Sequence, residues 1–322
     1  MEMSMTEDIW DVIVVGGGPA GLTAGIYAKR AGLDTVVLEK AVAGGQLAEA
    51  VTVENFPGFP EPIPGAELGG RIRKQAEKLG VRFQRGEAQG LGREGDFWVV
   101  ETDAGVMKGL AVIIATGGVP RELPAKGARE FKGRGVSYCA TCDGFFFRGK
   151  RVLMVGAGDA ALEEALFLTD ICEKVYVAVR HPKDDPRAIR AEAILKERAF
   201  SNPKIEFIWN VVVEEVRGDK TVKEVVLKDL GNGELKTLPV EGVFVKIGYR
   251  PATEWLRGVV ELDERGYVVT DEWMRTNQPG VFAAGDVRIP RGRYAQAVIA
   301  AAEGAIAALK AHEYISGNTT RR

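Results

Sequence analysis

The chain has 322 residues, which is enough for about two domains of ordinary size. Hydrophobic residues make up 46% and charged residues 27%, as in globular proteins that fold in water. The net charge is −2 with both signs interspersed, so the composition gives no reason to expect a nucleic-acid partner. Glycine accounts for 40 of the 322 residues, about 12% against an average of about 7%. This content predicts tight turns and close approach of the backbone to a ligand.

Targeting signals and a disulfide framework are not expected. The chain has three cysteines, too few for a disulfide-stapled scaffold. Residues 1–10 hold three acids and neither lysine nor arginine, so we expect no signal peptide. No apolar run approaches the ~20 residues that span a bilayer; residues 297–309 come closest, but they include Glu303 and predict a buried or amphipathic helix. These features predict a cytoplasmic protein without a membrane partner.

The N-terminal part predicts a strand-turn-helix-strand unit. The apolar run 11–15 is typical of a strand buried on both faces of a parallel sheet. It leads into the glycines of 16–21, a helix-compatible segment at 20–31 and a strand at 35–38.

In this context the Gly-x-Gly-x-x-Gly pattern of the turn predicts a dinucleotide site. The glycines allow a sharp turn, and the helix N-terminus offers unpaired N–H groups to a diphosphate. Glu39 lies 18 residues after Gly21, where a carboxylate accepts hydrogen bonds from an adenosine ribose with free hydroxyls. A plain tight turn without a ligand is the alternative.

A cysteine pair follows the next predicted strands. Residues 97–102 and those after Val106 predict antiparallel strands, and residues 112–118 predict another buried strand that ends in glycines. Beyond them, Cys139 and Cys142 form a Cys-x-x-Cys pattern. Such a pattern is half a zinc site, a redox pair or an accident.

A zinc site needs a second pair of ligands, and only Cys172, His181 and His312 remain, widely scattered, so we expect no metal. A redox pair suits the start of a helix, where the dipole lowers a thiol pKa. Asp143 follows directly and is the expected proton carrier, because the chain has only two histidines. An ordinary charge at a helix start is the alternative for Asp143, and Cys172 is expected to be an inert packed thiol.

Residues 151–155, 160–169 and 174–179 repeat the strand-helix-strand plan about 140 residues further on. The second glycine turn has Ala161 in place of its last glycine, which that position tolerates. No acid stands where Glu39 stands in the first unit; Arg180 and His181 follow the strand instead. An arginine there suits a ribose 2′-phosphate and favours NADP over NAD, with a solvated charge at a strand end as the alternative.

The segments around the second unit predict an insertion. Residues 211–227 predict further antiparallel strands, and residues 242–248 another buried strand with glycines. We interpret 112–118 and 242–248 as two crossings between domains, so that the second domain is inserted into the first. The expected fold class is α/β, with two Rossmann-like dinucleotide-binding domains of three-layer ββα architecture. The expected limits are 1–118 and 248–322 for the FAD-binding domain and 119–247 for the pyridine-nucleotide-binding domain with the Cys-x-x-Cys.

The chain resembles the low-molecular-weight thioredoxin reductases, which are FAD-dependent pyridine nucleotide-disulfide oxidoreductases, over nearly its whole length. The most specific match is the string Cys-Ala-Thr-Cys-Asp-Gly at 139–144 together with Gly285-Asp286. The other matches are Gly16 to Gly21, Gly44 to Leu47, Glu54 to Gly58, Ala115-Thr116-Gly117, Gly158 with Glu163 to Ala165, and Thr276 to Asp286.

The resemblance implies that the first site holds FAD and that the inserted domain holds NADPH. The residues that would bind FAD are Gly16, Gly18, Ala20, Gly21, Glu39, Gly45, Gln46, Leu47, Asn55, Ala115, Thr116, Gly117, Gly285, Asp286, Gln296 and Ala297. Those that would bind the pyridine nucleotide are Gly156, Gly158, Asp159, Ala160, Arg180, His181 and Arg187. Cys142 would face the flavin, Cys139 would be its partner, and Asp143 would be the acid–base residue.

The implied activity is that of a thioredoxin-disulfide reductase. Electrons would pass from NADPH through FAD and the Cys139–Cys142 disulfide to thioredoxin or a thioredoxin-like protein. The family is homodimeric and rotates the inserted domain, for which Gly117-Gly118 and Gly248-Tyr249 are the expected hinges.

Two departures from the family keep alternatives open. Segment 180–187 lacks the usual His-Arg-Arg cluster with its further arginine, and Tyr294-Ala295-Gln296 lacks the usual arginine near the flavin. NADH or ferredoxin could therefore replace NADPH as the electron donor. A dithiol oxidase that passes electrons to oxygen and a non-catalytic flavin-bound sensor are further alternatives.

Overall fold

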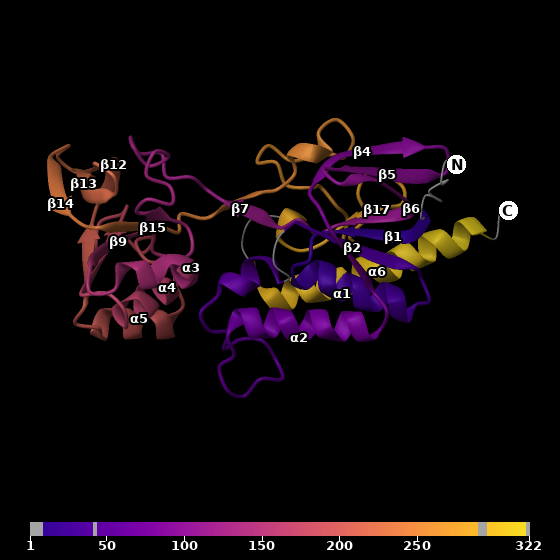
Figure 1. Ribbon diagram of the computed structural model, residues 1–322, viewed down its shortest axis with the longest axis horizontal. Helices are drawn as coiled ribbons and strands as arrows, with labels where there is room; N and C mark the ends of the chain where they lie inside the picture. The colour runs from indigo at the N-terminus through magenta and orange to yellow at the C-terminus, as the bar shows by residue number, and fades with distance from the viewer. Residues whose placement is uncertain (1–8, 41–43, 289–294, 320–322) are drawn as a thin grey trace, which may run out of the picture. The chain divides into compact units, whose positions relative to one another are not determined.

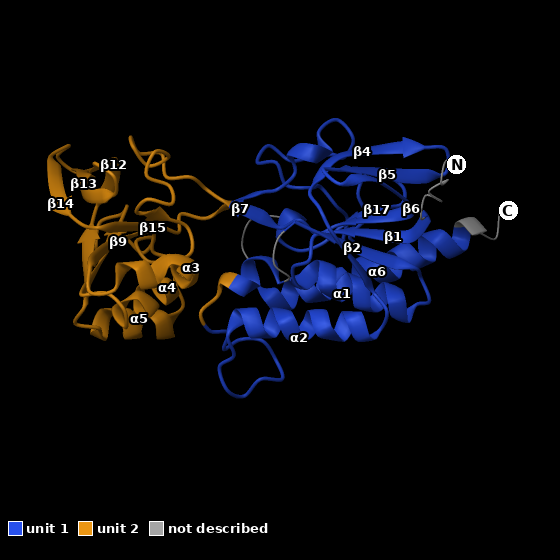
Figure 2. Cartoon of the chain, viewed as in Figure 1, with its two compact units in different colours: residues 1–48, 52–119, 250–322 blue, residues 49–51, 120–249 orange. Residues whose placement is uncertain are grey.

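The computed structural model describes residues 9–40, 44–288 and 295–319, which divide into two compact units (Figure 2). Unit 1 comprises residues 1–48, 52–119 and 250–322, and unit 2 comprises residues 49–51 and 120–249. The assignment of these parts to FAD and to a pyridine nucleotide stays a prediction. The described residues do not include 1–8, Tyr294 or 320–322. The expectations for these positions therefore stay untested.

A parallel sheet forms the middle layer of unit 1 (Figure 1). Its central strand β1 (Ile9–Val15) lies between β2 (Thr35–Glu39) and β6 (Gly105–Ile114), with Val14 opposite Val37 and Ile113. Strand β3 (Arg82–Arg85) extends the sheet beyond β2, and β17 (Val281–Ala283) pairs with β6. The apolar runs of β1 and β2 are buried on both faces, as their sequence predicts.

Strand β6 is one continuous strand, whereas the sequence predicted two separate ones around Val106 and at 112–118. Its first half pairs antiparallel with β5 (Phe97–Thr102), which pairs in turn with β4 (Ala88–Glu94). Its second half pairs in parallel with β17. The strand changes partner along its length, so its apolar pattern changes from alternating to continuous although the backbone does not break.

Two further layers cover the sheet of unit 1. Helices α1 (Pro19–Arg30), α2 (Gly65–Lys78) and α6 (Ala297–Thr319) cover one face, and the β4–β5 hairpin covers the other (Figure 1). Helix α6 is longer than the predicted 297–309, because Ala311 and Ile315 continue its buried face. A Cβ at Gly304 would overlap the carbonyl of Ala20, so glycine lets α6 pack closely on α1.

Unit 2 repeats this three-layer plan. Its parallel sheet has the order β11 (Ile205–Trp209), β10 (Lys174–Val179), β9 (Arg151–Val155), β15 (Gly242–Val245) and β8 (Val136–Ser137). Helices α4 (Asp159–Thr169) and α5 (Ala193–Ser201) pack on one face. The antiparallel strands β12 (Val211–Gly218), β13 (Val222–Asp229) and β14 (Leu235–Pro239) form the third layer. The predicted fold class, two Rossmann-like domains of ββα architecture, is confirmed.

The two crossings of the chain, β7 (Gly118–Pro120) and β16 (Tyr249–Pro251), pair with each other as a two-stranded sheet. Gly117 and Gly248, which precede them, have φ angles of +59° and +97°. These left-handed conformations favour glycine. Among the described residues, no helix is long and apolar enough to cross a membrane.

Candidate active site

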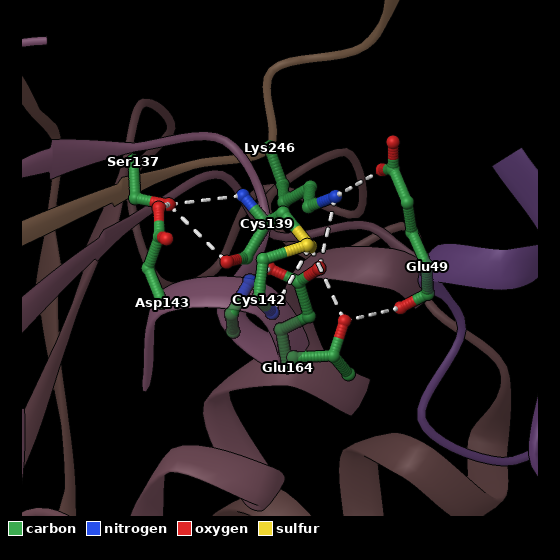
Figure 3. The surroundings of a disulfide bond; sticks show 9 residues. Glu49, Ser137, Cys139, Cys142, Asp143, Glu164 and Lys246 are labelled. Carbon is green, nitrogen blue, oxygen red and sulfur yellow. Dashed lines mark hydrogen bonds and ion pairs between the residues drawn. A yellow bond between two sulfur atoms is a disulfide. The ribbon is translucent and has the colours of Figure 1, made fainter. Parts of the chain in front are cut away.

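The Cys139–Cys142 disulfide lies at the start of α3 (Ala140–Asp143), a single helical turn of unit 2 (Figure 3). The sulfurs are 2.08 Å apart and the Cα atoms 5.3 Å apart. The sulfur of Cys139 accepts a hydrogen bond from the backbone N–H of Cys142 at 3.2 Å and lies 3.2 Å from Oγ1 of Thr141. Cys139 is half-buried and Cys142 is exposed, so the bond is open to attack by an external thiolate.

Asp143 is held beside this turn by a buried serine that the sequence analysis missed. Oγ of Ser137 donates to Oδ2 of Asp143 at 2.6 Å and accepts from the backbone N–H of Cys139 at 3.1 Å. The Ser137 residue is only 5% exposed. The structure therefore brings together the three predicted catalytic residues Cys139, Cys142 and Asp143, while the proton-carrying role of Asp143 stays a prediction.

A buried charge cluster on another side of the disulfide was also missed. Nζ of Lys246 lies 2.9 Å from Oε1 of Glu164 and 3.4 Å from Oε2 of Glu49. The side chains of Lys246 and Glu164 are each 5% exposed. The available signal was a lysine directly after the apolar strand β15, but the sequence does not show which partners reach it.

The first glycine turn has no room for a side chain at Gly16, Gly17 or Gly21, whereas a Cβ on Gly18 would meet nothing closer than 4.0 Å. Gly16 has φ +112°, and a Cβ there would overlap the carbonyl of Ala115. A Cβ on Gly21 would overlap the carbonyl of Gly16, and one on Gly17 would overlap the carboxylate of Glu39. The structure thus brings Glu39 to the turn. A turn of bare backbone at the start of α1, with a carboxylate beside it, fits the diphosphate and ribose of a dinucleotide.

Other predicted FAD residues surround the same turn. A Cβ on Gly45 would lie 3.2 Å from Cα of Gly18, and one on Gly285 would lie 3.0 Å from Cβ of Ala20. Segments far apart in the sequence therefore meet at the N-terminus of α1 with only small residues between them. This close approach of backbone is what the glycine content predicted.

Four polar side chains among the predicted FAD residues, those of Gln46, Asn55, Thr116 and Gln296, have partners within unit 1. Nε2 of Gln46 donates to a backbone carbonyl of β7 at 3.1 Å, and Oγ1 of Thr116 donates to the carbonyl of Ala252 at 2.9 Å. Nδ2 of Asn55 donates to Oε1 of Gln296 at 3.2 Å, which brings together two predicted residues 241 positions apart. The remaining predicted residues, Leu47, Gly117 and Ala297, carry no polar side chain.

Among the predicted FAD residues, Asp286 is the one whose side-chain pKa is shifted most from its usual value. Burial, together with the neighbouring Glu303, raises the pKa of Asp286 to about 6. Glu303 itself accepts from the backbone N–H of Gly285 at 2.8 Å and pairs with Arg288. A half-buried carboxylate of this kind fits a ligand that presents hydroxyl donors, because a hydrogen bond offsets the cost of removing charge from water.

The second glycine turn is crowded at Gly156 and open at Gly158, much as the first is at Gly16 and Gly18. A Cβ on Gly156, which has φ +127°, would overlap the carbonyl of Lys246, but one on Gly158 would meet no atom within 4 Å. Oδ1 of Asp159 accepts a backbone N–H at 2.7 Å from the residue before α5, and Ala160 is exposed. The N-terminus of α4 therefore also fits a diphosphate.

The structure does not leave Arg187 and His181 open as a phosphate site. Asp185 accepts from Nε and Nη2 of Arg187 at 3.0 and 2.7 Å, and from its backbone N–H at 2.8 Å. Nδ1 of His181 lies 3.4 Å from the same carboxylate. The hydrogen bonds from Arg187 hold the pKa of Asp185 well below its usual range. Arg180 is exposed.

Within residues 9–40, 44–288 and 295–319, no group of three or more His, Cys, Asp or Glu side chains is arranged to hold a metal ion. The third cysteine, Cys172, is buried near the end of α4. Burial raises the pKa of its thiol to about 11, in keeping with the packed position expected for it.

Comparison with known proteins agrees with this site. Residues 10–304 match the model of the pyridine nucleotide-disulphide oxidoreductase family. The thioredoxin reductase of Listeria innocua is 43% identical over 314 residues, which cover 97% of this chain and 96% of that protein.

Two solved structures have the same fold throughout. The thioredoxin reductase of Lactococcus lactis superposes with a TM-score of 0.91 at 39% identity and covers 96% of this chain and 99% of its own. That of T. acidophilum gives a TM-score of 0.89 at 37% identity, with 95% and 98% covered. The chain therefore belongs to the pyridine nucleotide-disulphide oxidoreductases and, within them, to the thioredoxin reductases.

Proposed function

We propose that this reductase passes electrons from a pyridine nucleotide, through FAD, to the Cys139–Cys142 disulfide and from there to thioredoxin or a thioredoxin-like protein. The observation that carries the proposal is the solvent-reachable disulfide at the start of α3, with Asp143 held beside it. We assign FAD to residues 1–118 and 248–322 and the nucleotide to residues 119–247, in a homodimer.

The residues around the first glycine turn support FAD binding. The bare turn 16–21 would hold the diphosphate, Glu39 the adenosine ribose, and Asp286 a hydroxyl-bearing part of the cofactor. Bound FAD would supply the chemistry of taking a hydride from the nucleotide and releasing two electrons to a disulfide. Gly45 and Gly285 let their backbone segments approach Gly18 and Ala20 closely, which brings backbone groups to the place where the diphosphate would lie.

The residues of the chain then carry the disulfide chemistry. Two electrons and two protons convert the Cys139–Cys142 bond into two thiols, and Asp143 is placed to take up or release one of the protons. A thiolate of the pair attacks the disulfide of the partner and forms a mixed disulfide, which releases one partner thiolate. The second cysteine attacks this bond, restores the Cys139–Cys142 disulfide and releases the partner as a dithiol.

A cysteine exchange tests this path. Cys142→Ser is expected to reduce nucleotide-driven thioredoxin reduction by at least about 1000-fold, because no intramolecular disulfide can form. Cys172→Ser is the matched control and keeps wild-type turnover, since that thiol is buried in the core. Full thioredoxin-dependent turnover in Cys142→Ser would refute the proposed path.

NADPH was the donor predicted from the sequence, but the contacts of Asp185 favour NADH as a second candidate. A 2′-phosphate would have to displace Asp185 from Arg187 or bind beside its negative charge. The ribose of NADH brings no such charge. Anaerobic bleaching of the flavin by NADH but not by NADPH would establish NADH as the donor. Bleaching by neither nucleotide would favour a protein donor such as ferredoxin, and rapid peroxide formation from a small dithiol would favour the oxidase.

Asp185→Asn sharpens the choice between the nucleotides without relying on turnover. The variant leaves Arg187 and His181 without the facing carboxylate, so 2′,5′-ADP is expected to bind about tenfold more tightly than to the wild type. Binding of 5′-ADP, which lacks the 2′-phosphate, should not change. Calorimetric titration with both ligands measures the difference, and Asp184→Asn, at an exposed neighbouring carboxylate, is the control. Equal affinity of wild type and Asp185→Asn for 2′,5′-ADP would show that Asp185 does not oppose a 2′-phosphate and would remove this argument for NADH.

A further inference from the structure

Lys246 is a buried cation beside the disulfide that the electron path above does not use. It follows β15, and its ammonium group lies between the carboxylates of Glu164, on α4, and Glu49 (Figure 3). Lys246 and Glu164 are nearly inaccessible to solvent, whereas the side chain of Glu49 is 34% exposed. Lysine and glutamate are almost never this deeply buried unless they are paired.

The pairing keeps Lys246 charged. Burial alone would lower its pKa, but the carboxylates of Glu164 and Glu49 raise it above the usual lysine value. Burial raises the pKa of Glu164, and the contact with Lys246 opposes that effect. Removing the ammonium group would leave Glu164 as a buried carboxylate without its cation, which is the costly way to break a buried pair.

Both carboxylate residues also contact the turn between the two cysteines. Oε2 of Glu164 accepts from the backbone N–H of Ala140 at 3.2 Å. The carbonyl of Glu49 accepts from Oγ1 of Thr141, also at 3.2 Å. These are the two residues between Cys139 and Cys142, and Thr141 Oγ1 lies 3.2 Å from the Cys139 sulfur. Each inter-cysteine residue is therefore anchored to one of the acids that Lys246 binds.

We propose that Lys246 is a positioning residue of the redox site, which holds Glu164 and Glu49 against the turn between the cysteines and offsets their negative charge there. Lys246 touches neither sulfur in this arrangement and acts through the two acids. Its effect on thioredoxin reduction rests on the function proposed above, whereas its effect on the cysteines themselves does not.

The charges near the turn between the cysteines determine in which direction Lys246 shifts the thiol pKa. Lys246, Glu164 and Glu49 sum to one negative charge. Removal of the lysine charge leaves up to two, less the fraction of Glu164 that takes up a proton once its cation is gone. Extra negative charge disfavours a thiolate and raises the pKa of a thiol. The other titratable groups facing the site are Tyr249, whose pKa burial raises above the usual tyrosine value, and Asp143, which lies on the Ser137 side.

Alkylation of the reduced protein tests the proposal without turnover. The test uses reduced protein in a Cys172→Ala background, so that Cys139 and Cys142 are the cysteines present. Iodoacetamide at pH 7 should alkylate them about fivefold more slowly in the Lys246→Met variant than in the parent. Glu164→Gln should react faster than the parent, because one negative charge is lost. The double variant Lys246→Met/Glu164→Gln restores the charge sum and should return near the parent rate. Lys204→Met is the control, since that lysine donates to the carbonyls of Thr169 and Cys172 instead.

Steady-state kinetics of thioredoxin reduction distinguish a positioning role of Lys246 from a purely structural one. Lys246→Met is expected to lower kcat for thioredoxin reduction about tenfold with an unchanged KM for the nucleotide, while Lys246→Arg keeps most of the activity. Parent-like alkylation and turnover in folded Lys246→Met would overturn the proposal. If Lys246→Met does not fold, parent-like alkylation of Glu164→Gln would overturn it as well. A wild type that reduces no thioredoxin would refute the function proposed above and leave the alkylation test standing.

Discussion

The two glycine turns share a strand-turn-helix plan but differ in what surrounds them. In the first turn, the carboxylate of Glu39 lies where a side chain of Gly17 would be. In the second, the strand ends at Val179 without an acid, and the nearby Arg187 is engaged by Asp185. The same backbone therefore supports two different ribose environments, and the duplicated fold does not imply duplicated ligand chemistry.

The turns also differ in how closely the helix approaches the strand. At the third position of α1, a Cβ on Gly21 would overlap the carbonyl of Gly16. The corresponding residue of α4 is Ala161, whose side chain is buried without such an overlap. Helix α1 therefore lies closer to its turn than α4 does. The first turn tolerates only glycine at a position where the second accepts alanine.

Gly21→Ala should have the largest effect on this difference. The added methyl group has to displace the backbone of the turn, because no flexible side chain is there to move. We expect a loss of about 3 kcal/mol in the free energy of unfolding and loss of most bound flavin. The ratio of absorbance at 450 and 280 nm and a urea titration measure the two effects.

The matched control is the reverse exchange in the second turn, Ala161→Gly. It removes a buried methyl group from α4 and adds a glycine to a helix, at a cost of about 1 to 2 kcal/mol. Flavin content should not change. Full flavin content and wild-type stability in Gly21→Ala would show that the two turns are equally tolerant.

Asp286→Asn tests the carboxylate that distinguishes the first site electrostatically. The folded pKa of Asp286 is about 6 against a reference of 3.8, so the folded state holds the proton more tightly than the unfolded state. The stability of flavin-free protein therefore falls as pH rises from about 4 to about 6 and stays low above that range. At pH 8 the variant should be more stable than the wild type by up to about 3 kcal/mol, and below pH 4 the difference should vanish.

Urea titration of the flavin-free protein between pH 3.5 and 8 measures this gain, and Glu264→Gln, at an exposed carboxylate, is the control. FAD should bind more weakly to Asp286→Asn, because a neutral amide accepts hydrogen bonds less strongly than a carboxylate. A variant with wild-type stability at pH 8 would mean that Asp286 is solvated in the folded protein.

Local sequence patterns predicted the strands, the glycine turns and the cysteine pair because each depends on neighbouring residues. Strand β10 (Lys174–Val179) lies at the predicted residues, since a continuous apolar run has one favourable placement in a parallel sheet. The sequence predicted two strands in place of β6, because the pairing partner of β6 changes beyond Gly109. This change alters the hydrophobic pattern of the sequence but does not interrupt the strand. Helix α2 (Gly65–Lys78) was not predicted.

The charged contacts around the disulfide could not be predicted in this way. Lys246 and Glu49 are 197 residues apart, and Glu164 lies on a different element from both. Burial of a charge depends on which elements the topology brings together, and a single sequence does not record that. The Ser137–Asp143 hydrogen bond spans only six residues, but it needs the end of β8 beside α3.

The smallest expected effect concerns Cys172, near the end of the helix that begins at the second glycine turn. Its pKa of about 11 keeps it a neutral thiol at physiological pH, and its burial excludes reagents. Cys172→Ala should change thioredoxin reduction less than twofold and the free energy of unfolding by about 1 kcal/mol. The reduced native protein should titrate two thiols with a disulfide reagent at pH 8, and the unfolded protein three. A third reactive thiol in the native protein would mean that α4 opens at its end, and that the second unit is looser around its turn than the first.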